Sequence, residues 1–206
     1  VKTAASGKLP RDITYGTKYF KDIHTWLLSY GSWRSTFTGY DAEYKVKGTH
    51  PMGGALSLLW HAQAGPVFAA TMNQYKLIEA PNMQSNTRKY LTGGTPRIEL
   101  IQNGVAYSNL DDLNTSITCH EREEACTFTV HTHLVDINQQ APLQGEVAMT
   151  MNYTYSEQGV SIHLEHCNEP IRLMLPVIAS PEENIEFSSH EVYIRKNKGV
   201  VCITCE

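Results

Sequence analysis

The chain has 206 residues, a formal net charge of −4 and 18% charged residues, while 41% of its residues are hydrophobic. This apolar content is sufficient for a packed core and excludes a disordered chain. The negative charge argues against a general nucleic-acid-binding protein, which normally has a basic surface. No apolar run reaches the ~18–20 residues of a membrane-spanning helix. We therefore expect no nucleic-acid partner and no membrane span.

The hydrophobic pattern predicts short strands along the whole chain and no long helix. Short runs of alternating or apolar residues are separated by Gly, Pro, Asn and Asp, a pattern typical of antiparallel sheets. Short helical turns are expected near 10–24. The predicted strands are 25–30, 32–44, 54–62, 66–72, 75–80, 97–102, 125–136, 146–156, 160–167, 171–178, 184–188, 191–196 and 200–205. This number of strands favours one all-β domain over 1–206, built as a large antiparallel sandwich of two sheets.

The predicted strand at 32–44, "SWRSTFTGYDAEY", contains the first candidate binding residues. Arg34 and Tyr40 share one face of this strand with two threonines. A guanidinium group can bind a carboxylate or sulfate through two parallel hydrogen bonds, and neighbouring hydroxyl groups suit a sugar. The alternative is an ordinary surface ion pair between Arg34 and an acid such as Asp41 or Glu43.

The stretch "KGTHPMGGALSLLWH" at 47–61 places a histidine just before a strand. Gly53 and Gly54 permit positive φ angles or a close approach of the backbone to another segment. His50 would lie in the loop at the strand entrance, where functional side chains are often displayed. A histidine there can act as an acid, a base or a neutralising charge.

The segments 125–136 and 146–167 predict a sheet with one buried face and one hydrophilic face. Threonine and histidine alternate with apolar residues in the first segment, and threonine and asparagine do so in the second. A two-residue loop at Gln158–Gly159 would join the strands of the hairpin. The rows of hydroxyl, amide and imidazole groups suit a hydroxyl-rich ligand. The alternative is a plain solvated face.

Two histidines on that face raise the question of a metal. His131 and His133 point the same way in a strand and could be two zinc ligands, with His163, Glu165 or Asp136 as a third. Two unliganded surface histidines are the alternative. The chain contains none of the common hydrolase, metalloprotease or nucleotide-binding motifs, so the sequence assigns no cofactor.

Five cysteines leave several pairings open. Cys119 and Cys126 flank the charged stretch "HEREEA", and a disulfide between them would close a hairpin-like loop. Cys202 and Cys205 form a CxxC pair, but a zinc ribbon needs a second such pair, which the chain lacks. We interpret these two as thiols packed in the last strand.

The run from "WRSTFTGYDAEYKVKGTHPMGGALSLLWH" to "APNMQ", at 33–84, resembles the start of the β domain of heparinase II/III-like polysaccharide lyases. Those enzymes join a helical toroid to a two-sheet β-supersandwich of the galactose-mutarotase-like architecture. The part "ALSLLW" is similar to the family's strand, and His50 stands where the family has a histidine. Gly53 and Gly54 replace the family's second His and its Asp, so the resemblance gives no metal site.

The resemblance implies β-elimination on a uronic-acid polysaccharide. In this family the toroid supplies most catalytic groups. His50 would then be a charge neutraliser or proton shuttle, with Arg34 and Tyr40 as substrate contacts. The chain would be the C-terminal part of a longer periplasmic or secreted protein, with an upstream helical domain and an acidic polysaccharide as partners, and inactive alone.

Two other functions remain open from the sequence. The chain could be a non-catalytic carbohydrate-binding or structural β-sandwich domain on the same scaffold. It could also be a mutarotase-like sugar epimerase, for which His163 and Glu165 are the candidate acid–base pair.

Overall fold

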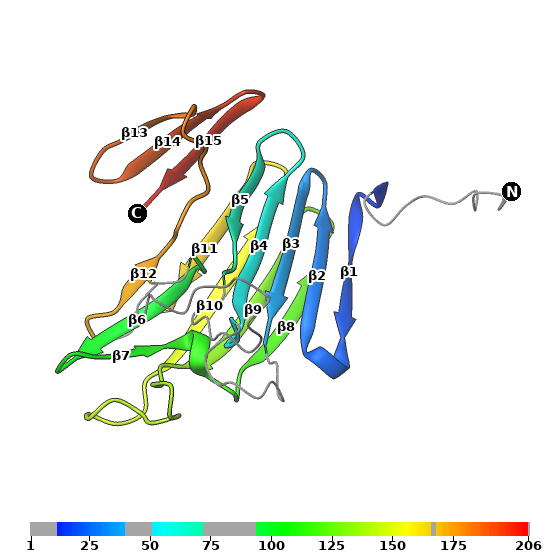
Figure 1. The fold of residues 1–206 in the computed structure, drawn as a ribbon. Coiled ribbons are helices and arrows are strands. Elements are labelled where there is room, and N and C mark those ends of the chain that lie inside the picture. Colours follow the sequence, from blue (N-terminus) through cyan, green and yellow to red (C-terminus); the bar gives the residue numbers. More distant parts are fainter. Residues whose placement is uncertain (1–11, 40–50, 72–93, 166–167, 206) are drawn as a thin grey trace, which may run out of the picture.

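The computed structural model describes residues 12–39, 51–71, 94–165 and 168–205, in which fifteen strands form four antiparallel sheets (Figure 1). The described helical structure consists of short 3-10 turns, such as η2 (Lys21–Ile23) and η4 (Asn109–Asp111). The expected all-β antiparallel sandwich is therefore confirmed. In the described part of the chain, no helix is long and apolar enough to cross a membrane.

The first large sheet is formed by consecutive strands in the order β1-β2-β3-β4-β5. Its strands are β1 (Tyr15–Phe20), β2 (Thr25–Tyr30), β3 (Trp33–Thr38), β4 (Ala55–His61) and β5 (Gly65–Ala69). Each strand pairs with the next one along the chain, so this sheet is a simple meander.

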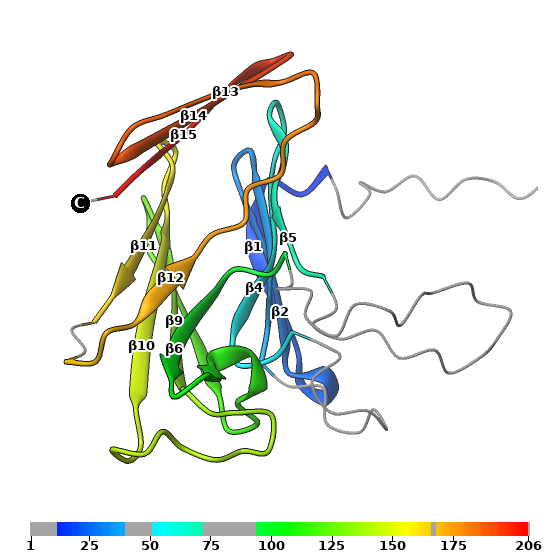
Figure 2. The same cartoon turned by 60° about the vertical axis from the view of Figure 1, so that its left-hand side comes forward.

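The second large sheet has the order β11-β10-β9-β8 and faces the first (Figure 2). Its strands are β8 (Ser116–Glu121), β9 (Cys126–His133), β10 (Ala148–Tyr155) and β11 (Val160–Leu164). The two sheets are the layers of the sandwich, with the main core between them.

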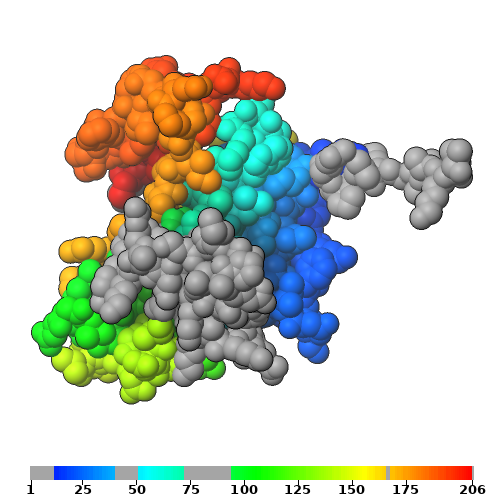
Figure 3. All heavy atoms as spheres, in the orientation of Figure 1, coloured from blue at the N-terminus to red at the C-terminus, as the bar shows by residue number. Residues whose placement is uncertain are grey.

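Two smaller sheets complete the described fold. One has the order β12-β6-β7 and contains β6 (Arg97–Gln102), β7 (Val105–Ser108) and β12 (Arg172–Met174). The other has the order β13-β14-β15 and contains β13 (Asn184–Phe187), β14 (Glu191–Lys196) and β15 (Gly199–Thr204). This last sheet forms a lobe at one end of the molecule (Figure 3).

The core is held by aromatic residues from both large sheets. The rings of Phe37 and Phe128 stack with their centroids 4.6 Å apart, and both side chains are fully buried. Tyr155 is also fully buried, and its hydroxyl group donates a 2.8 Å hydrogen bond to Ser35 Oγ in the opposite sheet. A polar tie of this kind satisfies groups that would otherwise be buried without a partner.

The hairpin of β10 and β11 has the predicted faces but a different register. Tyr153 is opposite Ile162, whereas a loop at Gln158–Gly159 would have placed it opposite Leu164. Ser156 and Gly159 bond each other in both directions, at 2.9 and 3.3 Å, and this closes the turn one residue earlier. The pairing therefore moves by two residues, which leaves the same side chains on each face.

Three strands were missed by the sequence pattern, namely β1, β7 and β8. In the described part of 10–24, where short helical turns were expected, Lys21–Ile23 do form a 3-10 turn, but Tyr15–Phe20 form the edge strand β1. Nearly every residue of β1 is exposed, so it lacks the apolar alternation that marks a strand. The strand expected at 75–80 lies outside the described residues.

The two glycines before β4 cross closely over the turn η4. Both have positive φ, 64° at Gly53 and 73° at Gly54. A Cβ atom on Gly53 would overlap the carbonyl oxygen of Asn109, and one on Gly54 would overlap the Val130 side chain. The buried Asn109 side chain accepts a 2.8 Å bond from the Ile98 amide and donates a 3.1 Å bond to the Gly53 carbonyl. The two glycines are therefore required for close packing of the chain against Asn109 and Val130.

This crossing predicts that Gly53→Ala destabilises the fold more than Gly65→Ala does. Gly65 has a similar φ of 74°, but the space where its Cβ would lie is open. Gly65→Ala therefore measures the backbone strain alone, which costs about 1–2 kcal/mol. Gly53→Ala adds a steric overlap, worth about 1–3 kcal/mol or more. Urea unfolding of both variants measures the difference, and equal losses would show that the crossing is not tightly packed.

The inter-sheet tie predicts a measurable coupling between Tyr155 and Ser35. Tyr155→Phe keeps the ring and removes the hydroxyl group, so it should lower the free energy of unfolding by about 0.5–1.5 kcal/mol. Combining it with Ser35→Ala in a double-mutant cycle isolates the hydrogen bond. Strictly additive losses would contradict the bond.

Candidate functional site

The outer side of the second large sheet is a broad hydrophilic surface, called the polar face below. Its side chains come from alternate positions of β8, β9, β10 and β11, because the intervening positions point into the core. The polar face consists of Ser116, Thr118, His120, Thr127, Thr129, His131, Thr150, Asn152, Thr154, Ser161 and His163. The alternation predicted for 125–136 and 146–167 is confirmed.

Hydrogen bonds across the strands orient the central groups of the polar face. They join Thr127 to Thr154 at 3.1 Å, Thr129 to Asn152 at 2.7 Å and His131 Nδ1 to Thr150 at 3.0 Å. Side chains held in rows present hydroxyl, amide and imidazole groups in a fixed pattern. A pattern of this kind can bind a ligand with less loss of side-chain entropy than a mobile surface.

The polar face carries imidazoles but no other cationic side chain. Neither Lys nor Arg occurs in β8, β9, β10 or β11. His120, His131 and His163 are exposed on it. Such a surface offers hydrogen-bond donors and acceptors to hydroxyl groups, and histidine can carry a proton near neutral pH. Its chemistry therefore suits a polar ligand that is rich in hydroxyl groups.

One end of the polar face is closed by a hydrogen-bonded cluster around His133. Its Nδ1 atom lies 3.2 Å from Asp112 Oδ2, and its Nε2 atom lies 2.9 Å from Glu146 Oε1. Asp112 is 2% exposed and also accepts bonds from the Thr132 hydroxyl at 2.9 Å and the His133 amide at 2.7 Å. The buried carboxylate therefore fixes the orientation of the imidazole ring, while the ring is partly exposed and Glu146 faces solvent.

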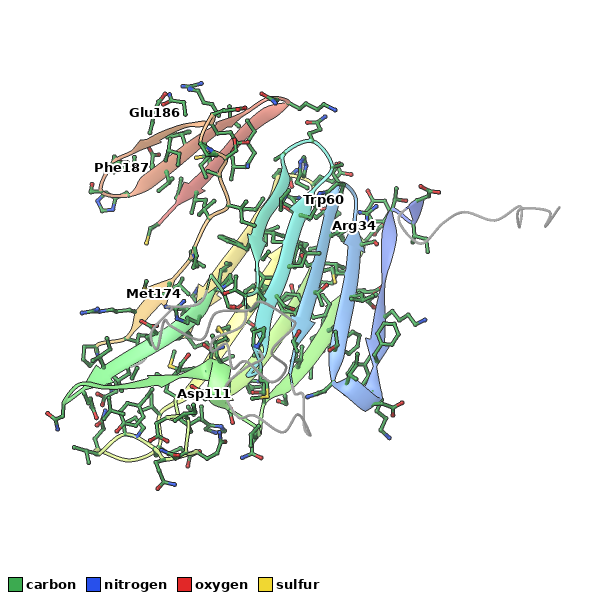
Figure 4. All side chains as sticks on the ribbon, viewed as in Figure 1. Arg34, Trp60, Asp111, Met174, Glu186 and Phe187 are labelled. Atoms are coloured by element: carbon green, nitrogen blue, oxygen red, sulfur yellow. The ribbon has the colours of Figure 1, made fainter. Side chains whose placement is uncertain are left out.

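A third acid, Asp111, lies beside this cluster in η4. Burial, together with the nearby Asp136 carboxyl group, raises the pKa of Asp111 to about 6. Figure 4 shows Asp111 at the end of the sandwich where η4 follows β7. Met52, two residues after His50, donates its amide to the Leu110 carbonyl at 3.3 Å. The chain therefore enters β4 next to these acids.

The described residues do not assemble the zinc site considered from the sequence. They include no group of three His, Cys, Asp or Glu side chains that could hold a metal ion. His131 bonds Thr150, while His133 bonds Asp112 and Glu146. The two imidazoles thus have separate partners.

Arg34 lies on the outer face of the first large sheet, on the side of β3 opposite the buried Ser35 and Phe37. Its guanidinium group donates to the carbonyl oxygens of Gly31 at 2.8 Å and Ile13 at 2.9 Å. Its directly opposed residue on β4 is Trp60, and both lie near the same end of the sheet (Figure 4). The other two sequence candidates, His50 and Tyr40, lie outside the described residues.

Sequence reasoning missed Asp112, Glu146 and Trp60 as site residues. Asp112 and Glu146 each lie in a connection between strands. Strand pairing therefore does not predict their contact with His133. Trp60 lies in an apolar run of the sequence that gives no sign of which side chains face outward. A register irregularity in β4, opposite Thr36 and Phe37, changes which side chains face outward.

Comparisons with known proteins identify the family of the chain. Residues 17–206 match the family model described as the ulvan lyase C-terminal domain. A broad-specificity ulvan lyase from Formosa agariphila is 34% identical over 203 residues, which cover 95% of this chain and 31% of that protein. The chain thus spans about a third of the length of this relative. No solved structure matches it significantly.

The family match extends over nearly the whole chain, including every strand of the two large sheets except the start of β1. The polar face and its histidines lie inside the matched region. This chain belongs to the ulvan lyase C-terminal domain family.

Proposed function

We propose that this chain is the C-terminal β domain of a lyase that acts on ulvan or a similar acidic polysaccharide, and that its polar face holds the polymer. The family match and the identity to a broad-specificity ulvan lyase support the substrate class. The observation that carries the binding role is the ordered row of hydroxyl, amide and imidazole groups across β8 to β11.

The implied reaction is β-elimination at a uronic acid. Neutralising the sugar carboxylate makes the adjacent C–H acidic, a base removes that proton, and an acid protonates the leaving oxygen. His50 is proposed as the neutraliser or proton shuttle from this domain. The remaining groups would come from a helical domain upstream, as in heparinase II/III-like lyases, so the chain alone would be inactive.

Arg34 and Tyr40 are proposed as substrate contacts. The carbonyl groups of Gly31 and Ile13 hold the guanidinium group of Arg34 in one place, opposite Trp60. A fixed cation beside an aromatic ring suits a sugar that carries a carboxylate or sulfate, because the charge binds the anion and the ring covers the sugar face. A polymer substrate outside the cell would require a periplasmic or secreted parent protein.

A non-catalytic carbohydrate-binding domain is the second candidate function. The polar face favours this binding function, because its histidines are exposed on the surface of a sheet. A sugar epimerase has less support, because His163 and Glu165 are both exposed at the edge strand β11 and its end. Cleavage by the parent protein would favour the lyase, and binding without cleavage would favour the second function.

The catalytic proposal predicts that His50→Ala in the parent protein lowers the rate of ulvan cleavage by about 10²-fold or more, because a positioned acid–base group is lost. The measurement is the ultraviolet absorbance of the unsaturated uronate product. His190→Ala, at an exposed histidine before β14, is the matched control and should retain full activity. Equal rates for both variants would contradict the role of His50.

The binding proposal predicts that added negative charge on the polar face weakens ulvan binding. Thr118→Glu with His131→Glu places two carboxylates there, and a loss of about 0.5–1 kcal/mol for each corresponds to about tenfold weaker binding. Asn197→Glu with Thr204→Glu adds the same charge at exposed positions near β15. Affinity electrophoresis with the parent protein compares the two. Equal weakening in both pairs would indicate a net-charge effect only.

A further inference from the structure

Two cysteines face each other at the closed end of the β8–β9 hairpin. Cys119 lies in β8, and Cys126 is the first residue of β9. Their Sγ atoms are 3.6 Å apart, and both are free thiols. The turn between the strands is closed by a 2.8 Å bond from the Arg122 amide to the Ala125 carbonyl. The hairpin therefore holds the two sulfur atoms in contact.

The backbone register allows the sulfur atoms to approach further. Cys119 pairs with Phe128 and Cys126 pairs with Glu121, so the cysteines occupy diagonal positions on the inner side of the sheet. A disulfide bond is about 2.05 Å long, so the sulfur atoms must move roughly 1.5 Å closer. Diagonal neighbours are more widely spaced than directly opposed ones, so the bridge would also tighten the twist of the hairpin.

A small cavity lies beside Cys126. It has a volume of about 180 Å³ and lies between the start of the first large sheet and the β8–β9 turn. Tyr15, Thr17, Glu121 and Cys126 are among the residues that line it. Cys126 is 2% exposed and borders this cavity, whereas Cys119 is itself partly exposed and can meet a small reagent directly.

The two thiols differ in their readiness to ionise. The hydrogen bond with Cys126 lowers the pKa of Cys119 below its ordinary value, and the Thr17 hydroxyl acts in the same direction. The same thiol–thiol hydrogen bond and burial raise the pKa of Cys126. Since the thiolate is the nucleophile in thiol–disulfide exchange, Cys119 is the attacking residue.

We propose that Cys119 and Cys126 are a reversible disulfide site that locks the β8–β9 edge of the polar face when a small-molecule disulfide is present. The Cys119 thiolate attacks one sulfur of oxidised glutathione and releases one glutathione thiolate. Cys126 then loses its proton and attacks Cys119 Sγ, and the second glutathione leaves as a thiolate. Two protein thiols are oxidised and one disulfide is reduced to two thiols, so the exchange balances.

Cys202 and Cys205 provide an internal control, because their thiols point away from each other. Both are exposed, and the Cys205 amide still pairs with the His190 carbonyl beyond the end of β15. Residues three apart in extended backbone point to opposite faces, so these two thiols cannot reach each other within the strand. They should accept glutathione separately and remain unlinked.

The test treats the full chain with oxidised glutathione, unfolds it in denaturant, alkylates the remaining thiols and maps the peptides without reduction. The expected product is a peptide pair joined through Cys119 and Cys126, lighter by two hydrogens, and restored to free thiols by excess dithiothreitol. The thermal midpoint should rise by about 5 °C in the linked form, because the unfolded chain is constrained.

Variants separate this site from general thiol reactivity. Cys126→Ala should leave Cys119 as a stable mixed disulfide with glutathione, and Cys119→Ser should abolish the link while Cys126 stays alkylatable. The proposal is overturned if both thiols in the wild-type chain remain alkylatable while Cys202 reacts. It is also overturned if Cys119 or Cys126 is found linked to Cys167 instead.

Discussion

The close crossing of Gly53 over Asn109 is the constraint on which the described architecture depends. At this point the chain enters β4 while touching the turn between β7 and β8. One buried side chain, Asn109, bonds the backbone of both Gly53 and Ile98. It thus connects the first large sheet to the β12-β6-β7 sheet, and the adjacent Gly54 packs against Val130 of the second large sheet. Any side chain at Gly53 would separate these parts.

Once the two large sheets are held together, the alternation of side chains along each strand determines which residues are buried and which face solvent. Apolar side chains such as Phe37, Phe128 and Tyr155 fill the space between the sheets. The alternate positions of the second sheet must then face solvent, and there the chain places hydroxyl, amide and imidazole groups. The polar face is therefore a direct consequence of the packing that forms the core.

The fold class and the faces of individual strands could be predicted, because alternation is a local property of the sequence. Register could not: the turn at Ser156–Gly159 closes one residue earlier than expected, and no side-chain pattern distinguishes registers that differ by two. The edge strand β1 was missed because it buries almost nothing. The resemblance marked Gly53 and Gly54 only as replacements for a His and an Asp, whereas the steric role of Gly53 depends on a segment more than fifty residues away.

The candidate site likewise has features that the local sequence predicts and features that it does not. Strand alternation places Arg34 on the side of β3 away from the core, but the carbonyl groups that hold it and its neighbour Trp60 depend on chain contacts that the sequence alone does not reveal. The cluster of Asp112, His133 and Glu146 likewise joins three separate segments. Sequence periodicity identifies which side chains are displayed, while the partners that orient them come from the tertiary fold.

Histidine footprinting tests the central claim, that the polar face holds the polysaccharide. The parent protein is labelled with diethylpyrocarbonate with and without ulvan, and the labelling rate of each histidine is followed by peptide mapping. His120, His131 and His163 should be protected by ulvan, while His190, on the distant small sheet, should react at an unchanged rate. Unchanged labelling of the three face histidines, under conditions where the protein retains ulvan, would contradict the account.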